Sequence, residues 1–214
     1  MKKFQIFFII LLISGSLYAD ETTKVINKLQ KVYNSAVDFS ANFGQKTFNR
    51  TLNKWVDASG KVYFKKKGKM RWEYKGDNAQ LIVSDGVTMW IYQPEAKQVL
   101  VSNIRSSLSK TPANFLEGIG RLKEDFNYKL LKLKDYPNNK YYSVEFIPKE
   151  KNPNLSRMII IMKKNNFNIV EIRTFDFFHN ENRISFSGSK INSKLSDKIF
   201  SFKPPKGTII RKMR

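Results

Sequence analysis

The stretch that decides the fold reads Gly60-Lys61-Val62-Tyr63-Phe64-Lys65-Lys66-Lys67-Gly68-Lys69-Met70-Arg71-Trp72-Glu73-Tyr74. It contains two strand-sized segments, Gly60 to Lys65 and Met70 to Tyr74, on either side of a short basic connection. An antiparallel strand with one face in water alternates apolar and polar residues. Two segments here do not alternate, because successive positions are apolar in Val62-Tyr63-Phe64 and in Thr88 to Tyr92. Both faces of this sheet are therefore expected to be covered or lined, with the core on one face and room for a cavity on the other.

Segments of the same kind repeat through the rest of the chain. They are Phe39 to Phe43, Gln80 to Ser84, Thr88 to Gln93, Gln98 to Ser102, Phe126 to Lys134, Tyr141 to Ile147, Met158 to Lys163, Ile169 to Phe175 and Ile184 to Ser189. Turn signals separate them at Asp85-Gly86, Pro94 to Lys97, Pro137 to Asn139, Asn165-Asn166 and His179 to Asn182. A twisted sheet with so many strands tends to curl towards a barrel, so we expect a mainly β fold with an apolar interior.

Helical patterns occur at two places beside the strands. Glu21 to Ala36 has apolar residues at the i, i+3, i+4, i+7 spacing of an amphipathic helix. A second, shorter helix is expected from Thr111 to Ile119, because Thr111 suits the N-cap and Pro112 the first helical position. These helices are expected to cover part of the sheet.

The first residues have the features of a secretory signal peptide. Two lysines precede an apolar run from Phe4 to Ile13, and Ala19 stands just before acidic Asp20. Ten apolar residues are too few to span roughly 30 Å of hydrocarbon. We expect residues 1–19 to be removed and residues 20–214 to form a single exported domain.

Composition excludes several kinds of chemistry. The absence of cysteine and the single histidine rule out a thiol nucleophile, a disulfide framework, a Cys-based metal site and a two-imidazole centre, and neither a cofactor nor a metal is expected. The formal charge is +21, and loss of Lys2 and Lys3 leaves 21 − 2 = +19. Because the lysines are scattered, they indicate solvated surface charge, or contact with anionic lipid or an acidic protein, and not nucleic acid.

Candidate catalytic residues are weak. Ser84-Asp85-Gly86 lies between two strand patterns and is interpreted as a turn, and His179 as an exposed residue at a hairpin tip. Gly118-Ile119-Gly120 lacks the third glycine of a dinucleotide fingerprint. We expect no enzymatic activity, with a lipid-modifying enzyme that uses Asp85 or Glu73 as an alternative.

The order of these segments resembles a known family. The opening stretch is followed by Val83-Ser84-Asp85-Gly86, Met89 to Pro94 and Gln98-Val99, and then by Thr111-Pro112, Ile147-Pro148-Lys149 and Phe200 to Gly207. This series is similar to LolA, the periplasmic lipoprotein carriers of Gram-negative bacteria, over essentially all of the mature chain. The resemblance implies an incomplete antiparallel barrel of about eleven strands, with a helical lid over an apolar cavity for acyl chains.

The resemblance also implies a function. Proteins of this kind are periplasmic chaperones that accept outer-membrane lipoproteins from a LolCDE-type ATP-driven transporter and pass them to a LolB-type receptor or directly to the membrane. We expect a monomer with that role, and a lipid- or lipoprotein-sensing regulatory module of the same fold is the alternative. An acyl chain of about fifteen carbons costs roughly 12 kcal/mol to expose to water, at about 0.8 kcal/mol per CH₂, so a carrier has to shelter it.

Site residues follow from the resemblance position by position. The acyl-chain cavity is assigned to Met70, Trp72, Ile82, Met89, Leu116 and Ile172, with Phe115 on the lid helix and Trp90 as an alternative lining residue. The family's Arg-Pro pair falls on Lys66-Lys67, so the lid latch is assigned to Lys66, with Lys69 or Arg71 as substitutes. Lysine lacks the planar fork of donors that arginine offers, and Lys67 lacks the fixed φ of proline.

Overall fold

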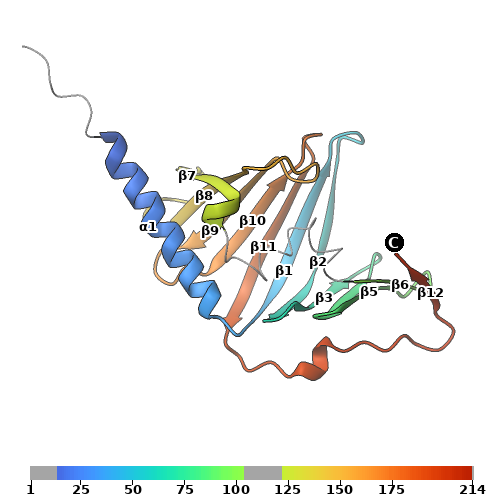
Figure 1. Ribbon diagram of the computed structural model, residues 1–214. Helices are drawn as coiled ribbons and strands as arrows, with labels where there is room; N and C mark the ends of the chain where they lie inside the picture. Colours follow the sequence, from blue (N-terminus) through green and yellow to red (C-terminus); the bar gives the residue numbers. More distant parts are fainter. Residues whose placement is uncertain (1–13, 104–121, 214) are drawn as a thin grey trace, which may run out of the picture.

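The structure, a computed structural model, describes residues 14–103 and 122–213, with side chains from Glu21 onward. Its strands form one 12-stranded sheet in the order β12-β6-β5-β4-β3-β2-β1-β11-β10-β9-β8-β7. The elements are α1 (Ser14–Ser35), β1 (Asp38–Asn49), β2 (Lys54–Lys65), β3 (Lys69–Lys75), β4 (Leu81–Asp85), β5 (Thr88–Gln93), β6 (Gln98–Asn103), α4 (Leu122–Asp125), β7 (Phe126–Leu131), β8 (Tyr141–Pro148), β9 (Arg157–Lys163), β10 (Ile169–Phe175), β11 (Glu181–Ile191), the 3₁₀ helix η2 (Asp197–Phe200) and β12 (Ile209–Lys212). Figure 1 shows their arrangement.

The predicted fold class is confirmed: the protein is mostly β, with few helices and an open sheet. Strands β5 and β10 have the predicted bounds, and each of the other predicted strand segments overlaps a strand of the sheet. The expected number of about eleven strands is exceeded because the basic tail adds β12, which pairs in parallel with β6. The other neighbouring strands are antiparallel.

Helix α1 packs on one face of the sheet, as its pattern predicts. Val25, Ile26 and Leu29 are buried in the main apolar cluster, and Tyr33 follows one turn later. The Tyr33 hydroxyl accepts a hydrogen bond from the backbone N–H of Ile169 over 3.0 Å, which ties the helix to β10. Burial raises the pKa of Tyr33 to about 12, so its hydroxyl is neutral at ordinary pH.

The sheet curls strongly between its two ends, so that β3, β5 and β6 lie at a steep angle to β10 and β11 (Figure 1). Gly60 lies in β2 where the chain passes close to its neighbours. A Cβ at this position would stand 1.8 Å from the carbonyl oxygen of Glu73 and 2.9 Å from the ring of Phe43. Only glycine therefore permits this close approach of β2 to β3.

The C-terminal segment, residues 192–208, runs along the other face of the sheet beneath β3 and β5 to reach β12 (Figure 1). Its start is held by Asp38, whose carboxylate accepts hydrogen bonds from the N–H groups of Ser193 at 2.7 Å and Leu195 at 3.0 Å. Phe200 in η2 is fully buried, and the Phe202 ring lies against Trp90 on β5. This segment covers the outward side of β4 and β5, which explains why these two strands carry apolar residues on both faces.

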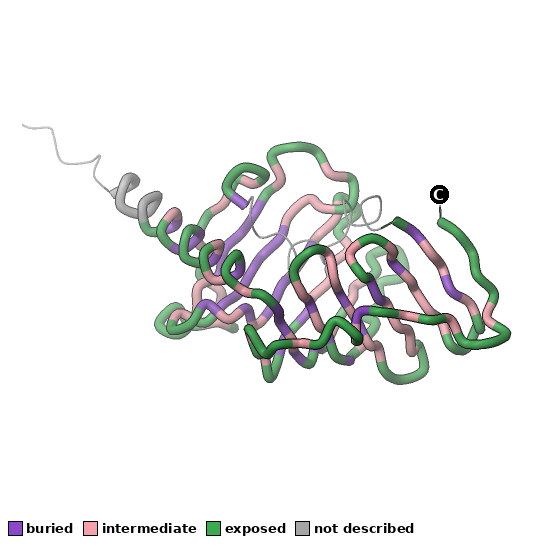
Figure 2. Tube along the Cα trace, turned by 60° about the horizontal axis from the view of Figure 1, so that its bottom comes forward, coloured by how far each residue is buried: buried purple, intermediate pink, exposed green. Residues whose placement is uncertain are grey.

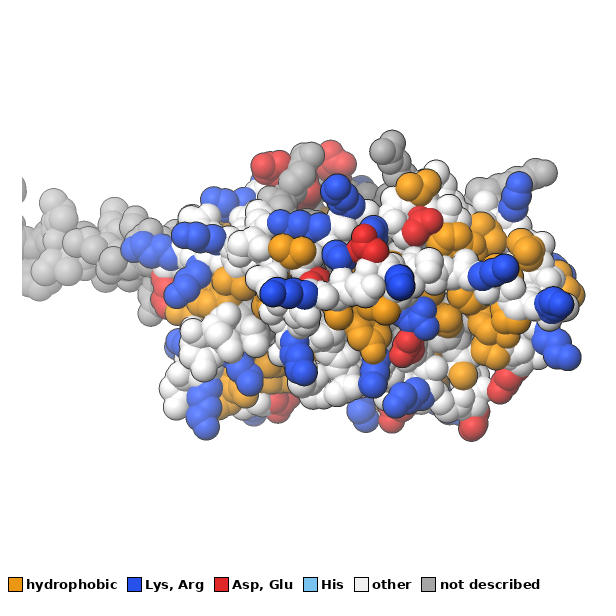
Figure 3. Space-filling view, turned by 90° about the horizontal axis from the view of Figure 1, so that it is seen from below, with side chains coloured by type: hydrophobic (Ala, Val, Ile, Leu, Met, Phe, Trp, Pro, Cys, Tyr) orange, Lys and Arg blue, Asp and Glu red, His pale blue; other side chains and the backbone are white. Residues whose placement is uncertain are grey.

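Two surface properties follow from the described residues. No helix there combines the length and the hydropathy needed to cross a bilayer. Lysine and arginine side chains are spread over the whole of the face seen in Figure 3, among fewer acidic ones. The dispersion expected from the sequence is therefore visible on this face.

Candidate functional site

We refer to the face of the sheet that packs against α1 as the inner face, and to the opposite one as the outer face. Directly paired residues share a face, so the register places Val62, Trp72, Ile82, Ile91 and Leu100 in one row across β2 to β6 on the inner face. A second row on this face runs Phe64, Met70, Ser84, Met89 and Ser102. The two rows make an apolar surface in the strongly curled half of the sheet.

Aromatic rings fill the middle of this face. Trp72 lies 4.9 Å from Phe43 and 5.7 Å from Phe64, centroid to centroid, in edge-to-face arrangements. Tyr74 also packs edge-to-face on Phe43 at 5.0 Å and stacks on Trp72 at 6.2 Å, and burial raises the pKa of Tyr74 to about 12. Such contacts hold the rings in fixed positions and give the inner face a firm apolar floor.

Exposure changes along the row that contains Trp72. Val62 and Trp72 are buried, whereas Ile82, Ile91 and Leu100 stay half-buried. Figure 2 shows the buried positions gathered along the strands behind α1. We call Ile82, Ile91 and Leu100 the inner-face row, since they carry accessible apolar surface on a wall that is otherwise packed.

The structure brings most of the predicted cavity residues together. Met70, Trp72, Ile82 and Met89 lie on adjacent strands of the inner face, and Ile172 lies on the same face in the half that α1 covers. Trp90 does not join them: it points to the outer face, where it meets Phe202 at 6.3 Å. Strand periodicity puts Met89 and Trp90 on opposite sides, and only the position of α1 shows which side is inner.

The remaining cavity residues, Phe115 and Leu116, lie outside the described residues. The cavity and its lid therefore stay predictions. Ile91 and Leu100 were missed by the sequence reasoning, although both alternate with outer-face residues in strands β5 and β6. The alternation Met89, Ile91 in β5 was the signal that could have found Ile91.

The three predicted latch cations have other partners in the part of the chain that is described. Lys66 donates to the carbonyl oxygen of Asn34 at 2.9 Å, near the end of α1. Lys69 pairs with Asp197 at 2.9 Å, and Arg71 donates to the carbonyl oxygen of Ile199 at 3.1 Å. Lys69 and Arg71 thus hold the C-terminal segment on the outer face, and a latch by Lys66 stays a prediction.

The turn that contains Lys66 and Lys67 also explains the departure from the family's proline. Lys67 has a φ of 71° and Gly68 a φ of 77°. Proline is fixed near −65° and could not adopt the conformation of Lys67. The basic residues here therefore belong to a different kind of turn from the one that proline would impose.

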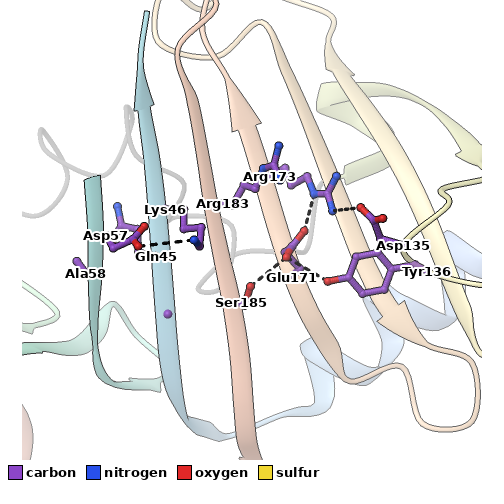
Figure 4. Close-up of a pocket in the computed structure, with 11 residues that line it drawn as sticks. Gln45, Lys46, Asp57, Ala58, Asp135, Tyr136, Glu171, Arg173, Arg183 and Ser185 are labelled. Atoms are coloured by element: carbon purple, nitrogen blue, oxygen red, sulfur yellow. Dashed lines mark hydrogen bonds and ion pairs between the residues drawn. The ribbon is translucent and has the colours of Figure 1, made fainter. Parts of the chain in front are cut away.

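A polar pocket of about 580 Å³ lies over the adjacent strands β2, β1, β11 and β10, beside Asp135 and Tyr136 of the β7–β8 loop (Figure 4). Buried Glu171 accepts hydrogen bonds from Tyr136 at 3.1 Å and Ser185 at 3.0 Å, and it also pairs with Arg173. Burial, with the nearby Glu171 charge, raises the pKa of Tyr136 to about 12. The charged groups of this pocket pair with one another, which suits a role in holding the strands and not an apolar ligand.

The weak catalytic candidates have structural contacts. The Asp85 carboxylate accepts hydrogen bonds from the N–H groups of Val87 and Thr88, both at 2.8 Å, and so shapes the β4–β5 turn. Ser84 donates to the carbonyl oxygen of Gly68 at 2.9 Å, and Glu73 pairs with Arg71 at 2.6 Å. These contacts bear out the interpretation of Ser84-Asp85-Gly86 as a turn.

Comparison with known proteins supports the resemblance seen in the sequence. The profile of the family described as outer membrane lipoprotein carrier protein LolA matches residues 34–203. The chain belongs to the LolA family. Members of this family are periplasmic carriers and chaperones that act in lipoprotein transport and outer-membrane biogenesis, and the family is not a family of enzymes.

Individual LolA relatives match nearly end to end. The chain is 32% identical over 195 residues to an outer-membrane lipoprotein carrier protein of Chromobacterium violaceum, which covers 91% of each protein. It is 30% identical over 211 residues to the protein of the same name from Legionella pneumophila, with 97% of this chain and 98% of that protein covered.

Solved structures show the same fold at low identity. An uncharacterised conserved protein from Thermus thermophilus superposes with a TM-score of 0.56 at 11% identity, over 89% of this chain and 98% of that one. MucB superposes with a TM-score of 0.53 at 9% identity, over 86% of this chain and 63% of MucB. These likenesses concern the fold alone.

Proposed function

We propose that this protein carries outer-membrane lipoproteins by sheltering their acyl chains on the inner face of the sheet. The observation that supports this most is the inner-face row: Ile82, Ile91 and Leu100 remain half-buried beside a packed aromatic floor. Membership of a lipoprotein carrier family supplies the class of cargo. The rest of the proposed binding surface consists of Met70, Trp72, Met89 and Ile172. The proposed lid would add the side chains of Leu116 and Phe115.

An acyl chain is the ligand that this surface suits. The row consists of aliphatic side chains with no charged group among them, so it offers dispersion and water exclusion but no polar recognition. Binding of this kind depends on chain length and hardly on the identity of the protein attached. A carrier that serves many lipoproteins needs such tolerance.

The proposal includes the cellular route. Residues 1–19 serve as a cleaved signal peptide, and residues 20–214 work as one carrier domain in the periplasm. Cargo comes from a LolCDE-type inner-membrane transporter and goes to a LolB-type receptor or directly to the membrane. Release requires that the acceptor bind the acyl chains more tightly than the inner face does.

The test is formation of a soluble complex with a triacylated lipoprotein. Ile82→Glu places a charge in the row, and we expect at least a tenfold loss of complex, because a carboxylate against acyl chains loses its hydration without gaining a partner. Size-exclusion chromatography with lipoprotein released from detergent measures the fraction bound.

The matched control is Val87→Glu, the same type of change five residues away in the exposed β4–β5 turn. It should bind like the wild type. Equal complex formation by the Ile82 and Val87 variants would refute the assignment of the inner face, and a wild type that takes up no lipoprotein would refute the carrier function itself.

A further inference from the structure

Two hairpin turns at one edge of the sheet expose apolar side chains. The β1–β2 turn and its strand ends present Leu52, Trp55 and Val56, with 72%, 41% and 49% of their surfaces exposed. The β10–β11 turn presents Phe177 and Phe178, with 56% and 75% exposed. We call these five residues the apolar tip. A cluster of this kind is unusual on a soluble surface and marks a site of interaction.

The two turns lie side by side. Strands β1 and β11 are paired to their ends, with Phe48 opposite Glu181, and the backbone N–H of Arg50 donates to the Asn180 side chain at 2.8 Å. Both turns stand at the upper edge of the sheet in Figure 1. The two turns, distant in sequence, therefore form one projecting tip, and consecutive Trp55 and Val56 lie on its two opposite faces.

Hydrogen bonds hold the two turns in shape. The Asp176 carboxylate accepts from the N–H groups of Phe178 and Asn180, both at 2.9 Å, and from the Asn180 side chain at 2.7 Å. The Asn49 side chain accepts from the N–H of Leu52 at 3.0 Å. Because the backbone is already ordered, binding through the tip requires little further loss of conformational entropy.

Basic side chains stand beside the apolar tip, together with two acidic ones, Asp176 and Glu181, of which Glu181 pairs with Arg183 at 2.5 Å. Arg50 and Lys54 are exposed in the β1–β2 hairpin, and the Arg183 guanidinium lies 5.0 Å from the centre of the Trp55 ring. Exposed Lys151 belongs to the β8–β9 loop, which is tied to the β10–β11 turn by a 3.0 Å hydrogen bond from the Ser156 hydroxyl to the Asp176 carbonyl oxygen. Without residues 1–19 the chain has a formal charge of 21 − 2 = +19. Apolar and aromatic side chains that project between basic ones match the interface of an anionic bilayer.

We propose that the apolar tip is a docking surface for anionic phospholipid membranes. Leu52, Phe177 and Phe178 enter the boundary between headgroups and acyl chains, Trp55 lies at headgroup level, and Arg50 and Lys54 contact lipid phosphates. The shape favours a bilayer over a folded protein partner, because the two turns project from the edge of the sheet (Figure 1). The contact is peripheral and reversible, since only a few side chains enter the lipid.

Vesicle binding by the cargo-free mature chain tests this proposal independently of the carrier function. We expect sedimentation with vesicles of phosphatidylglycerol and phosphatidylethanolamine, and weaker sedimentation with phosphatidylcholine alone or at high salt. Leu52→Ser/Phe177→Ser/Phe178→Ser should lower the partition coefficient at least tenfold. Arg50→Gln/Lys54→Gln should lower it about fivefold per charge on anionic vesicles only.

The matched control removes apolar side chains elsewhere. Ile209→Ser/Ile210→Ser changes two residues of β12 that are 56% and 58% exposed, and it should leave the partition coefficient unchanged. Circular dichroism of each variant checks that the fold is intact.

Tryptophan fluorescence locates the contact. With Trp72→Phe and Trp90→Phe, the remaining Trp55 should be quenched by vesicles that contain brominated lipid. Absence of vesicle binding by the wild type, equal binding by the tip variant and the wild type, or an unquenched Trp55 on bound protein would each overturn the proposal. Binding to an acidic protein but not to vesicles would overturn it in favour of a protein partner.

Discussion

The inner face of the sheet is packed in one half and left partly exposed in the other. In the half under α1, Phe146 and Ile160 are completely buried in the main apolar cluster. On β4 to β6, Ile82, Ile91 and Leu100 are as apolar but remain half-buried. Full burial of one such side chain stabilises the fold by about 1.5–3 kcal/mol. Because these three side chains are only half-buried, folding gains a few kcal/mol less from them than full burial would give. One half of the inner face therefore contributes stability, while the other keeps accessible apolar surface, which the proposed carrier function uses for acyl chains.

The largest expected effect distinguishes the two halves by stability. Phe146→Ala removes a ring that packs edge-to-face on Phe126 at 5.9 Å, and it should lower the free energy of unfolding by about 3–5 kcal/mol. Ile91→Ala in the open half should cost about 1 kcal/mol, because the side chain is already half-exposed. Urea unfolding followed by circular dichroism measures both. Equal losses would show that the open half is packed as tightly as the half under α1.

A second experiment uses neighbouring residues on β5. Ile91→Ser should weaken the lipoprotein complex about tenfold while changing stability little, because Ile91 belongs to the inner-face row. Trp90→Ala should do the reverse: it removes the contact with Phe202 on the outer face and lowers stability by about 1–3 kcal/mol, with cargo affinity unchanged. Complex formation and urea unfolding of both variants provide the comparison, and cargo loss in the Trp90 variant would show that the outer face takes part in binding.

The smallest expected effect concerns the C-terminal segment. Lys65 and Lys69 pair with Asp197 at 2.6 and 2.9 Å and lower the pKa of its carboxyl to about 2. Because the pKa of Asp197 is lower in the folded protein than its unfolded value of 3.8, the ion pairs stabilise the fold at pH values above 3.8. This stabilisation is lost as the pH falls towards the folded-state pKa of about 2. Asp197→Asn should therefore lower the Tm slightly at pH 7 and not at pH 2. A Tm difference that stays constant between these pH values would contradict the role of the ion pairs.

Much of the fold could be predicted from the sequence, because strand-sized apolar segments bounded by turn residues mark strands such as Thr88 to Gln93. Strand β12 could not be predicted, since Ile209 to Lys212 is exposed on both faces and pairs with the distant β6. The contacts of Lys69 and Arg71 with the C-terminal segment were missed for a similar reason. Their partners, Asp197 and Ile199, are distant in sequence, and no local pattern predicts that this segment crosses the outer face of the sheet. Periodicity alone likewise could not decide which face of β5 was inner, so Trp90 was grouped with residues from which the sheet separates it.

In the proposed function, acyl chains lie on the inner face of the curled sheet. Trp72 is on this face and Trp90 is on the outer face. Two variants report on the two sides: one keeps only Trp72 and the other only Trp90, with the remaining two tryptophans changed to phenylalanine. The measurement is fluorescence quenching in the soluble complex with a lipoprotein that carries brominated acyl chains. We expect strong quenching of Trp72 and little quenching of Trp90. An unquenched Trp72, or equal quenching of both, would refute binding on the inner face.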